Sequence, residues 1–416
     1  MKNKRSIYSW ALYDWANSAF STTVAAGFFP VFFKTYWSNG ADATITTARL
    51  ASVISISSLL IALISPTLGA MADLRGLKKI FCVVFMLLGS ASCAWMGFIG
   101  QGEWFLAACA FGLAMMAFNA SCVFYDSLLP SVASGKDMDW VSSLGYSLGY
   151  LGGGVLFAVN VAMFLKPAWF NLPDGVSAVQ WSFISVAVWW FLFSWPLILF
   201  VPEKKFHLST GSVSLWKMTS DSVQRLWQTC KKISKNKNML YFLLGFWLYI
   251  DGVYTVMTMA VDFGISLGFA SQDLIAALLV TQFVGFPFAI GFGYLAKIWG
   301  TKKPILICLL FYVLTVIGAT FMSKAWHFYV LAAVIGMVQG GVQSLSRSLF
   351  GRMISAEESG EYFGLFNLIG KFASILGPIL VAGTVLVTGQ SRMGLLGLIV
   401  IFCIGGFLLF KVQEPE

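Results

Sequence analysis

The chain has 416 residues, of which 58% are hydrophobic and only 11% are charged. Soluble domains carry about 25% charged residues, so this composition excludes a soluble enzyme, a nucleic-acid-binding module and a disordered scaffold. The net charge of +9 does not indicate nucleic acid, because that binding needs a soluble basic face. We therefore expect a multi-pass membrane protein.

Hydrophobic segments long enough to cross a bilayer recur along the chain, since about 20 apolar residues span its hydrocarbon core. They cover residues 10–36, 47–72, 79–100, 104–130, 140–165 and 178–201, then 239–262, 272–296, 303–323, 326–351, 361–388 and 393–411. The first segment contains Asp14, whereas the apolar region of a cleaved signal peptide is shorter and lacks a carboxylate. This pattern predicts an all-α polytopic membrane protein with 12 transmembrane helices.

A basic segment divides these helices into two sets of six. We expect an N-terminal six-helix bundle over residues 1–201, a linker over 202–238 with an interfacial helix around 215–233, and a C-terminal bundle over 239–416. Cytoplasmic loops are enriched in Lys and Arg. With the N-terminus inside, twenty of the 27 Lys and Arg fall in cytoplasmic segments and five in external ones. Both termini and the linker are therefore predicted to be cytoplasmic.

Two loops repeat one another and indicate a duplication. Residues 69–79 read GAMADLRGLKK and residues 293–303 read GYLAKIWGTKK. Each loop joins the second and third spans of its half. The shared glycines permit close helix packing and a tight reversal, and the shared lysines anchor the loop at the cytoplasmic face. The loops differ at Asp73, which is replaced by Lys297 in the second copy.

Duplicated six-helix halves that face each other across a cavity are the architecture of the major facilitator superfamily (MFS). The loop around Asp73 resembles the signature of that superfamily, although here Arg75 supplies the extra cation. The resemblance implies that Asp73 and Arg75 belong to the conformational gate.

A narrower resemblance rests on motifs in both halves. They are YDWANSA at 13–19, LGYSLGYLGGG at 144–154, QGGVQSLSRS at 339–348, FGLF at 363–366, Gly370-Lys371 and Gly377-Pro378. Together they resemble the vacuole-effluxer-like branch, named for an autophagy-related vacuolar amino-acid effluxer, over essentially the whole chain. This resemblance implies a secondary transporter, not an enzyme, with amino acids as the implied cargo.

Five charged residues fall inside predicted spans, where a lone charge costs at least about 2.5–3.5 kcal/mol. They are Asp14, Asp126, Asp251, Arg347 and Lys371. Asp251 and Lys371 lie about ten to twelve residues into their spans, near mid-membrane. We expect Lys371 to bind the carboxylate of a zwitterionic amino acid and Asp251 its ammonium group. The alternative is a permanent pair that neutralises both.

Polar residues at helical spacing extend this substrate site. They are Asn17 on the first span, Tyr254 on the seventh, Gln339 and Gln343 on the tenth, and Asn367 on the eleventh. Spans one, four, seven and ten line the cavity by the resemblance, so we expect these side chains to contact the substrate.

The other intramembrane charges predict a gate and a coupling site. Asp126 and Arg347 lie near the cytoplasmic ends of spans four and ten, at equivalent places in the two halves. We expect Arg347 to pair with Asp126 or Asp14 when the inside is closed; a static bridge within one half is the alternative. Three Asp against two basic residues leave one carboxylate over. We expect Asp14 to carry a coupling proton, with sodium bound by Asn17 and Ser18 as the alternative.

No cofactor or metal is expected. The seven cysteines form no C-x-x-C motif, the two histidines lie far apart, and residues 364–371 lack the spacing of a phosphate-binding P-loop. We expect a monomeric carrier of a small molecule in the inner (cytoplasmic) membrane, surrounded by lipid, with no nucleic-acid partner. The alternatives are a carrier of a larger amphipathic cargo, such as a siderophore or lysolipid, and a transport-dead membrane sensor.

Overall fold

The computed structural model describes residues 4–203, 215–266, 271–373, 375–389 and 391–415, and all regular elements in these ranges are helical. The first half comprises α1 (Lys4–Ala19), η1 (Phe20–Phe28), α2 (Phe29–Phe32), η2 (Phe33–Trp37), α3 (Ala43–Arg75), α4 (Lys78–Met96), α5 (Trp104–Ser127), α6 (Leu129–Val132), α7 (Asp137–Leu165), η3 (Pro167–Phe170) and α8 (Gly175–Phe200). The remainder comprises α9 (Leu215–Lys235), α10 (Lys237–Ser266), α11 (Ser271–Trp299), α12 (Lys302–Ala319), α13 (Ala325–Met353), α14 (Ser359–Phe372), α15 (Leu376–Thr388), η4 (Ser391–Gly397) and α16 (Leu398–Lys411).

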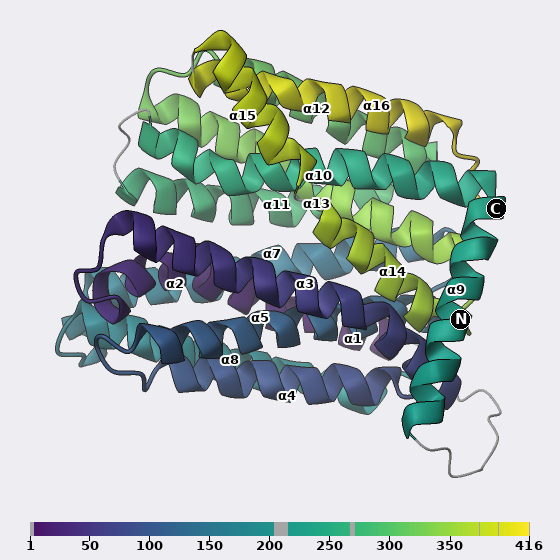
Figure 1. Cartoon of the computed structure of the whole chain (residues 1–416), viewed down its shortest axis with the longest axis horizontal. Helices are drawn as coiled ribbons and strands as arrows, with labels where there is room; N and C mark the ends of the chain where they lie inside the picture. The colour runs from purple at the N-terminus through teal and green to yellow at the C-terminus, as the bar shows by residue number, and fades with distance from the viewer. Residues whose placement is uncertain (1–3, 204–214, 267–270, 374, 390, 416) are drawn as a thin grey trace.

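Eleven helices within the described residues are long and apolar enough to cross a membrane. The first predicted span is helical from Lys4 to Trp37, but it alternates between α- and π-helical segments and so is not one long α-helix. Both chain ends and α9 lie at the same end of the molecule (Figure 1), which we call the terminal face. Ends on one face require an even number of crossings, in agreement with twelve. That the terminal face is cytoplasmic stays a prediction.

Two separate hydrophobic cores hold the helices together. The buried residues of one core lie between Trp10 and Val201, and those of the other lie between Met239 and Val412. These correspond to the lower, purple-to-blue layer and the upper, green-to-yellow layer of Figure 1. Each core therefore consists of buried side chains from one predicted half. The surfaces where the halves face each other are left for other contacts.

The halves meet chiefly along two helix pairs, α3 with α14 and α7 with α11. Both pairs depend on small residues. A Cβ added at Gly69 would lie 2.1 Å from the carbonyl oxygen of Gly360, and one added at Gly293 would lie 2.6 Å from the Cβ of Ser143. The repeated glycines of the two loops therefore permit the closest approaches between the halves.

The eleventh predicted span differs from the expectation of one continuous helix. Its first part, α14, ends at Phe372, and its second part, α15, begins at Leu376. Pro378 lacks a backbone N–H and fits the first turn of a helix better than its interior. Gly377 has no room for a side chain, because an added Cβ would lie 1.9 Å from Oγ1 of Thr255.

The predicted interfacial helix of the linker corresponds to α9, which runs across the ends of the spans (Figure 1). Residues 204–214 of the predicted linker lie outside the described residues.

Candidate functional site

A large cavity of about 1520 Å³ lies between the two halves. At the face opposite the termini its lining includes Tyr36, Gln101 and Gly175, and at its inner end it reaches Arg347. Nine of the predicted site residues line this cavity: Asp14, Asn17, Asp126, Tyr254, Gln339, Gln343, Arg347, Asn367 and Lys371. The other three, Asp73, Arg75 and Asp251, do not line it.

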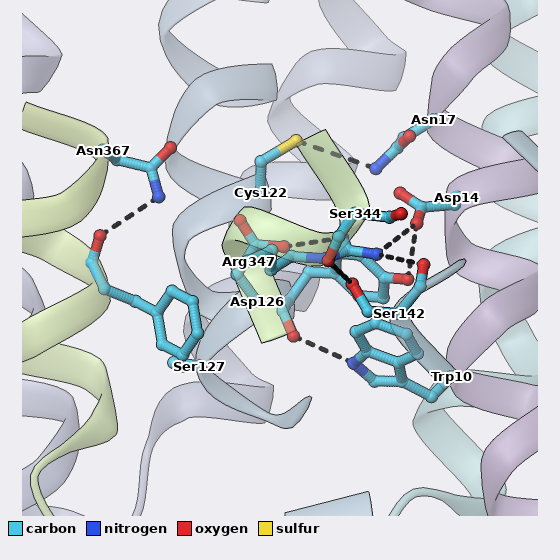
Figure 2. Close-up of polar contacts among 12 residues, drawn as sticks. Trp10, Asp14, Asn17, Cys122, Asp126, Ser127, Ser142, Ser344, Arg347 and Asn367 are labelled. Carbon is cyan, nitrogen blue, oxygen red and sulfur yellow. Dashed lines mark hydrogen bonds and ion pairs between the residues drawn. The ribbon is translucent and has the colours of Figure 1, made fainter. Parts of the chain in front are cut away.

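Arg347 of α13 joins the two halves at the inner end of the cavity (Figure 2). Its NH1 atom lies 2.8 Å from Oδ1 of Asp126 on α5, and its NH2 atom lies 3.2 Å from Oδ2 of Asp14 on α1. The guanidinium also donates to the hydroxyl and carbonyl oxygens of Ser142 on α7, both at 2.9 Å. Only 3% of the Arg347 side chain is exposed. The structure therefore brings the three predicted gate charges together, and their bridge crosses from one half to the other.

Aromatic rings surround this cluster, and a glycine without a side chain leaves room for it. The guanidinium carbon of Arg347 lies 4.4 Å from the ring centroid of Tyr146 and 4.9 Å from that of Trp10, distances at which cations are attracted to ring faces. The Tyr125 hydroxyl donates to Oδ2 of Asp14 at 2.8 Å. A Cβ added at Gly145 would lie 2.5 Å from the same oxygen. The glycine at this position of α7 thus makes room for the ion pairs.

The glycine-rich segment of α7 continues this close contact along the first span. Cβ atoms added at Gly149, Gly152 and Gly153 would lie within 2.6 to 2.8 Å of atoms of Ser18, Trp15 and Thr22, respectively. These contacts turn the polar face of the first span toward the cavity, where Asn17, Ser18 and Ser21 line the wall.

Lys371 lies at the end of α14, beside the break in the eleventh span, and lines the cavity. Among the described residues its ammonium group makes no ion pair or hydrogen bond. One turn earlier, the side-chain amide of Asn367 donates a hydrogen bond to the carbonyl oxygen of Phe363 at 3.1 Å (Figure 2). The side-chain oxygen of Asn367 therefore remains available to other partners. Within the described part of the chain, Lys371 is therefore a cation in the cavity wall that has no protein counterion.

Asp251 is not placed as the sequence predicts. It is fully buried on α10, and it accepts hydrogen bonds from the backbone N–H groups of Leu376 (2.9 Å) and Gly377 (2.7 Å) and from the Thr255 hydroxyl (3.3 Å). It forms no ion pair with Lys371, so neither the predicted zwitterion site nor the permanent pair is formed. Asp251 instead caps the N-terminus of α15, which the break in the eleventh span exposes.

Asp73 connects the halves at the terminal face. It pairs with Lys78 at 2.7 Å and accepts hydrogen bonds from the backbone N–H groups of Gly360 and Glu361 at 2.9 and 2.7 Å. Lys78 in turn donates to Ser359 at 2.8 Å. The first repeated loop is thus bound to the start of α14. Arg75 is exposed and makes no such contact within the described residues, so the structure gives it no place in this junction.

Sequence reasoning missed a further junction around Asp139 of α7. This buried carboxylate lies 3.2 Å from NH1 of Arg352 and accepts hydrogen bonds from the hydroxyls of Thr301 (2.9 Å) and Ser348 (2.5 Å). Thr301 belongs to the second repeated loop. The repeat itself could have indicated this contact, because each loop binds the start of a span in the opposite half.

The two loops are also capped in the same way. Glu203 accepts from the backbone N–H groups of Lys78 and Lys79 at 2.7 and 3.2 Å, and Glu414 accepts from those of Thr301 and Lys302 at 2.9 Å each. Each glutamate follows the last span of its half. Burial raises the pKa of Glu203 above its ordinary value, against the lowering effect of the N–H groups that it caps.

Comparison with known proteins covers the whole chain. The family described as "Vacuole effluxer Atg22 like" matches residues 2–139 and 134–415. A Bacillus subtilis protein described as "Uncharacterized MFS-type transporter YxiO" is 38% identical over 408 residues, covering 98% of this chain and 94% of that protein. Autophagy-related protein 22-2 of Penicillium rubens is 26% identical over 280 residues, covering 61% of this chain; the chain spans about half (46%) of that fungal relative.

Solved structures agree in fold. The human organic anion transporter MFSD10 (TETRAN) matches with a TM-score of 0.74 at 14% identity, covering 98% of this chain and 99% of that one. The MFS transporter FucP in its outward conformation matches with a TM-score of 0.68 at 11% identity, covering 99% of each chain. At these identities the likeness shows the fold alone.

Proposed function

The chain belongs to the Atg22-like vacuole effluxer family and is a multi-pass membrane transporter with the MFS fold, and on this premise we propose that it carries amino acids by alternating access, coupled to protons. The observation that carries the proposal is the bridge from Arg347 to Asp126 and Asp14 at the inner end of the cavity. This bridge would act as a gate between the halves. It would also place a surplus negative charge at the inner end of the binding site.

The gate follows from the position of the bridge. Alternating access requires contacts between the halves that form in one state and break in the other. Arg347 belongs to the second half, and Asp126 and Asp14 belong to the first. The cavity lies on the far side of this bridge from the terminal face. With the terminal face cytoplasmic, as the positive-inside bias predicts, this state is closed to the cytoplasm and open outward.

The cargo site uses Lys371 and the carboxylates of the gate. The ammonium group of Lys371 faces the cavity without a protein counterion, so it would bind the carboxylate of an amino acid. The two carboxylates at Asp14 and Asp126 exceed the single positive charge of Arg347, so their surplus negative charge would attract the amino group. This assignment replaces Asp251, which the structure commits to the cap of α15.

Proton coupling is supported by the same charge balance. Two buried carboxylates share one guanidinium, which leaves one negative charge that a proton would neutralise. Asp14 is the proposed proton carrier, since it has the longer of the two contacts with Arg347, at 3.2 Å against 2.8 Å for Asp126. A proton on Asp14 would weaken the bridge across the halves, and this links protonation to opening of the gate.

Transport into proteoliposomes tests the proposal. Purified protein should accumulate radiolabelled amino acids under an imposed pH gradient, with or without sodium. Lys371→Gln should strongly reduce this uptake at amino-acid concentrations below the native KM, whereas Lys166→Gln, which removes an exposed lysine at the opposite face, should retain it. A sodium requirement would replace the proton with sodium bound near Asn17 and Ser18. Absence of uptake for every amino acid would refute the proposed cargo.

The size of the cavity favours a second candidate. At about 1520 Å³ it exceeds the roughly 300–1,000 Å³ of ordinary small-molecule sites, and its walls include the rings of Phe28, Phe118 and Phe157. A larger amphipathic cargo, such as a siderophore or lysolipid, would fill this space. Protection of the purified protein against thermal unfolding by lysolipids or siderophores, but not by amino acids, would favour it.

A further inference from the structure

A second depression lies at the terminal face, apart from the central cavity, with which it shares no lining residue. It has a volume of about 770 Å³, and we call it the linker pocket because α9 of the linker forms one side. Its lining includes four lysines (Lys232, Lys235, Lys237 and Lys411) together with Asn238 and Gln413. No acidic side chain is among the described residues that line it.

The floor of the linker pocket is built by hydrogen bonds between distant segments. The Asn238 amide donates to the carbonyl oxygen of Gln413 at 2.8 Å, and the backbone N–H of Gln413 donates back to the Asn238 side chain at 2.7 Å. Asn236 caps α10 by accepting from the N–H groups of Asn238 and Met239 at 3.1 and 3.2 Å. These bonds fix the start of α10 against the residues that follow α16.

The pocket carries more positive charge than the protein neutralises. Lys232 pairs with Glu358 at 3.0 Å, outside the pocket lining. Lys235, Lys237 and Lys411 form no ion pair with the described residues. Three uncompensated cations that face one depression favour an anion with several oxygen atoms.

The pocket also lies where two spans end. Lys237 begins α10 and Lys411 ends α16. The Lys411 ammonium lies 4.6 Å from the ring centroid of Phe407, and 57% of the Phe407 side chain is exposed. Leu244, also on the lipid side, is 41% exposed. Exposed apolar side chains on membrane spans contact acyl chains, and basic pockets at this level bind anionic headgroups.

We propose that the linker pocket binds an anionic phospholipid. Its phosphate would lie among Lys235, Lys237 and Lys411, and its acyl chains would follow Phe407 and Leu244. The bound headgroup would hold the end of α9 against the ends of α10 and α16. An anionic lipid therefore stabilises the attachment of the linker to the second half.

Lipid titration of the full-length protein tests this. In neutral detergent, dioctanoyl phosphatidylglycerol should raise the melting temperature, and the titration gives an apparent Kd. Dioctanoyl phosphatidylcholine and glycerol 3-phosphate, which test an uncharged lipid and a soluble phosphate, should not raise it. The triple variant Lys235→Gln, Lys237→Gln and Lys411→Gln should raise the Kd for phosphatidylglycerol about tenfold or more.

A matched triple variant controls for overall charge. Lys4→Gln, Lys136→Gln and Lys303→Gln removes three exposed lysines from the same face outside the pocket, and its Kd should stay within about twofold of the native value. An equal loss in both triples would overturn the proposal, because binding would then follow net charge. Stabilisation by glycerol 3-phosphate equal to that by the lipid would also overturn it. If the pocket triple does not fold, the single variant Lys411→Gln should still weaken lipid binding, and an unchanged Kd there would overturn the proposal.

Discussion

Replacing Arg347 with glutamine should open the terminal face of the central cavity. The guanidinium makes four polar contacts: with Asp126 at 2.8 Å, with Asp14 at 3.2 Å, and with two oxygens of Ser142 at 2.9 Å. Glutamine has no charge and reaches less far. It would leave two carboxylates, each with a side chain 13% exposed, without a cation between them. Removing one partner of a buried ion pair costs about 3–5 kcal/mol.

This cost falls on the closed state, because the bridge joins different halves and breaks when they separate. At about 1.4 kcal/mol per factor of ten in an equilibrium constant, the loss of about 3 kcal/mol would shift the equilibrium toward the open terminal face on the order of 100-fold. From a native ratio of about 1:99, a shift of this size would bring the open and closed states to roughly equal populations.

Distance measurements between two spin labels by pulsed electron paramagnetic resonance can detect this change. Spin labels at Ser134 and Glu357, exposed positions on the terminal face in opposite halves, should show a longer distance in Arg347→Gln than in the native protein. Arg75→Gln removes an exposed arginine of the same face and should leave the distance unchanged. A folded Arg347→Gln protein with the native distance distribution would refute the reasoning, because the bridge would then not determine which state is populated.

Four further substitutions test other parts of the structure. Lys371→Gln should raise the KM of amino-acid uptake about tenfold or more, as expected for loss of a charged hydrogen-bond partner, and uptake kinetics measure it. Asp251→Asn should lower the free energy of unfolding by about 0.5–2 kcal/mol through loss of the α15 cap but leave KM unchanged; a raised KM would place it at the substrate. Gly145→Ala adds a Cβ 2.5 Å from a gate carboxylate oxygen and should abolish most uptake, whereas Gly318→Ala, with nothing within 4 Å, should not. Asp73→Asn should make the loop before α14 more accessible to proteolysis, and an unchanged cleavage rate would contradict its role as a junction.

Hydropathy predicts most of the fold because each span must satisfy its backbone internally and bury its apolar side chains in lipid or protein. It does not predict where a span is interrupted. Apart from a few polar residues such as Asn367 and Lys371, the eleventh span is apolar from end to end, so its composition indicates one helix. The signal for the break was Gly377-Pro378, whose steric and hydrogen-bonding demands act on the backbone rather than on hydropathy.

The candidate site was predicted in part. The offset between repeats correctly related Asp126 to Arg347, since equivalent places in two facing halves lie close together. Depth in the membrane misled the prediction for Asp251, because depth fixes a residue's height but not its direction around the helix axis. Its carboxylate is held by the free N–H groups of Leu376 and Gly377, which a continuous helix would not have offered.

The carboxylate contacts that the described residues make between the halves at the terminal face share one polarity. Four acids of the first half make them: Asp14, Asp73, Asp126 and Asp139. Their partners in the second half are Arg347, Arg352 and the backbone N–H groups at the start of α14. Because these four acids lie on the same side, protonation of any of them weakens the attraction between the halves. The second repeated loop keeps this polarity although Lys297 replaces the acid found in the first, since its junction takes the acid Asp139 from the opposite half. Under the proposed proton coupling, such a transporter has its gate and its proton sites in the same residues, which is the simplest arrangement in which protons can drive the change of state.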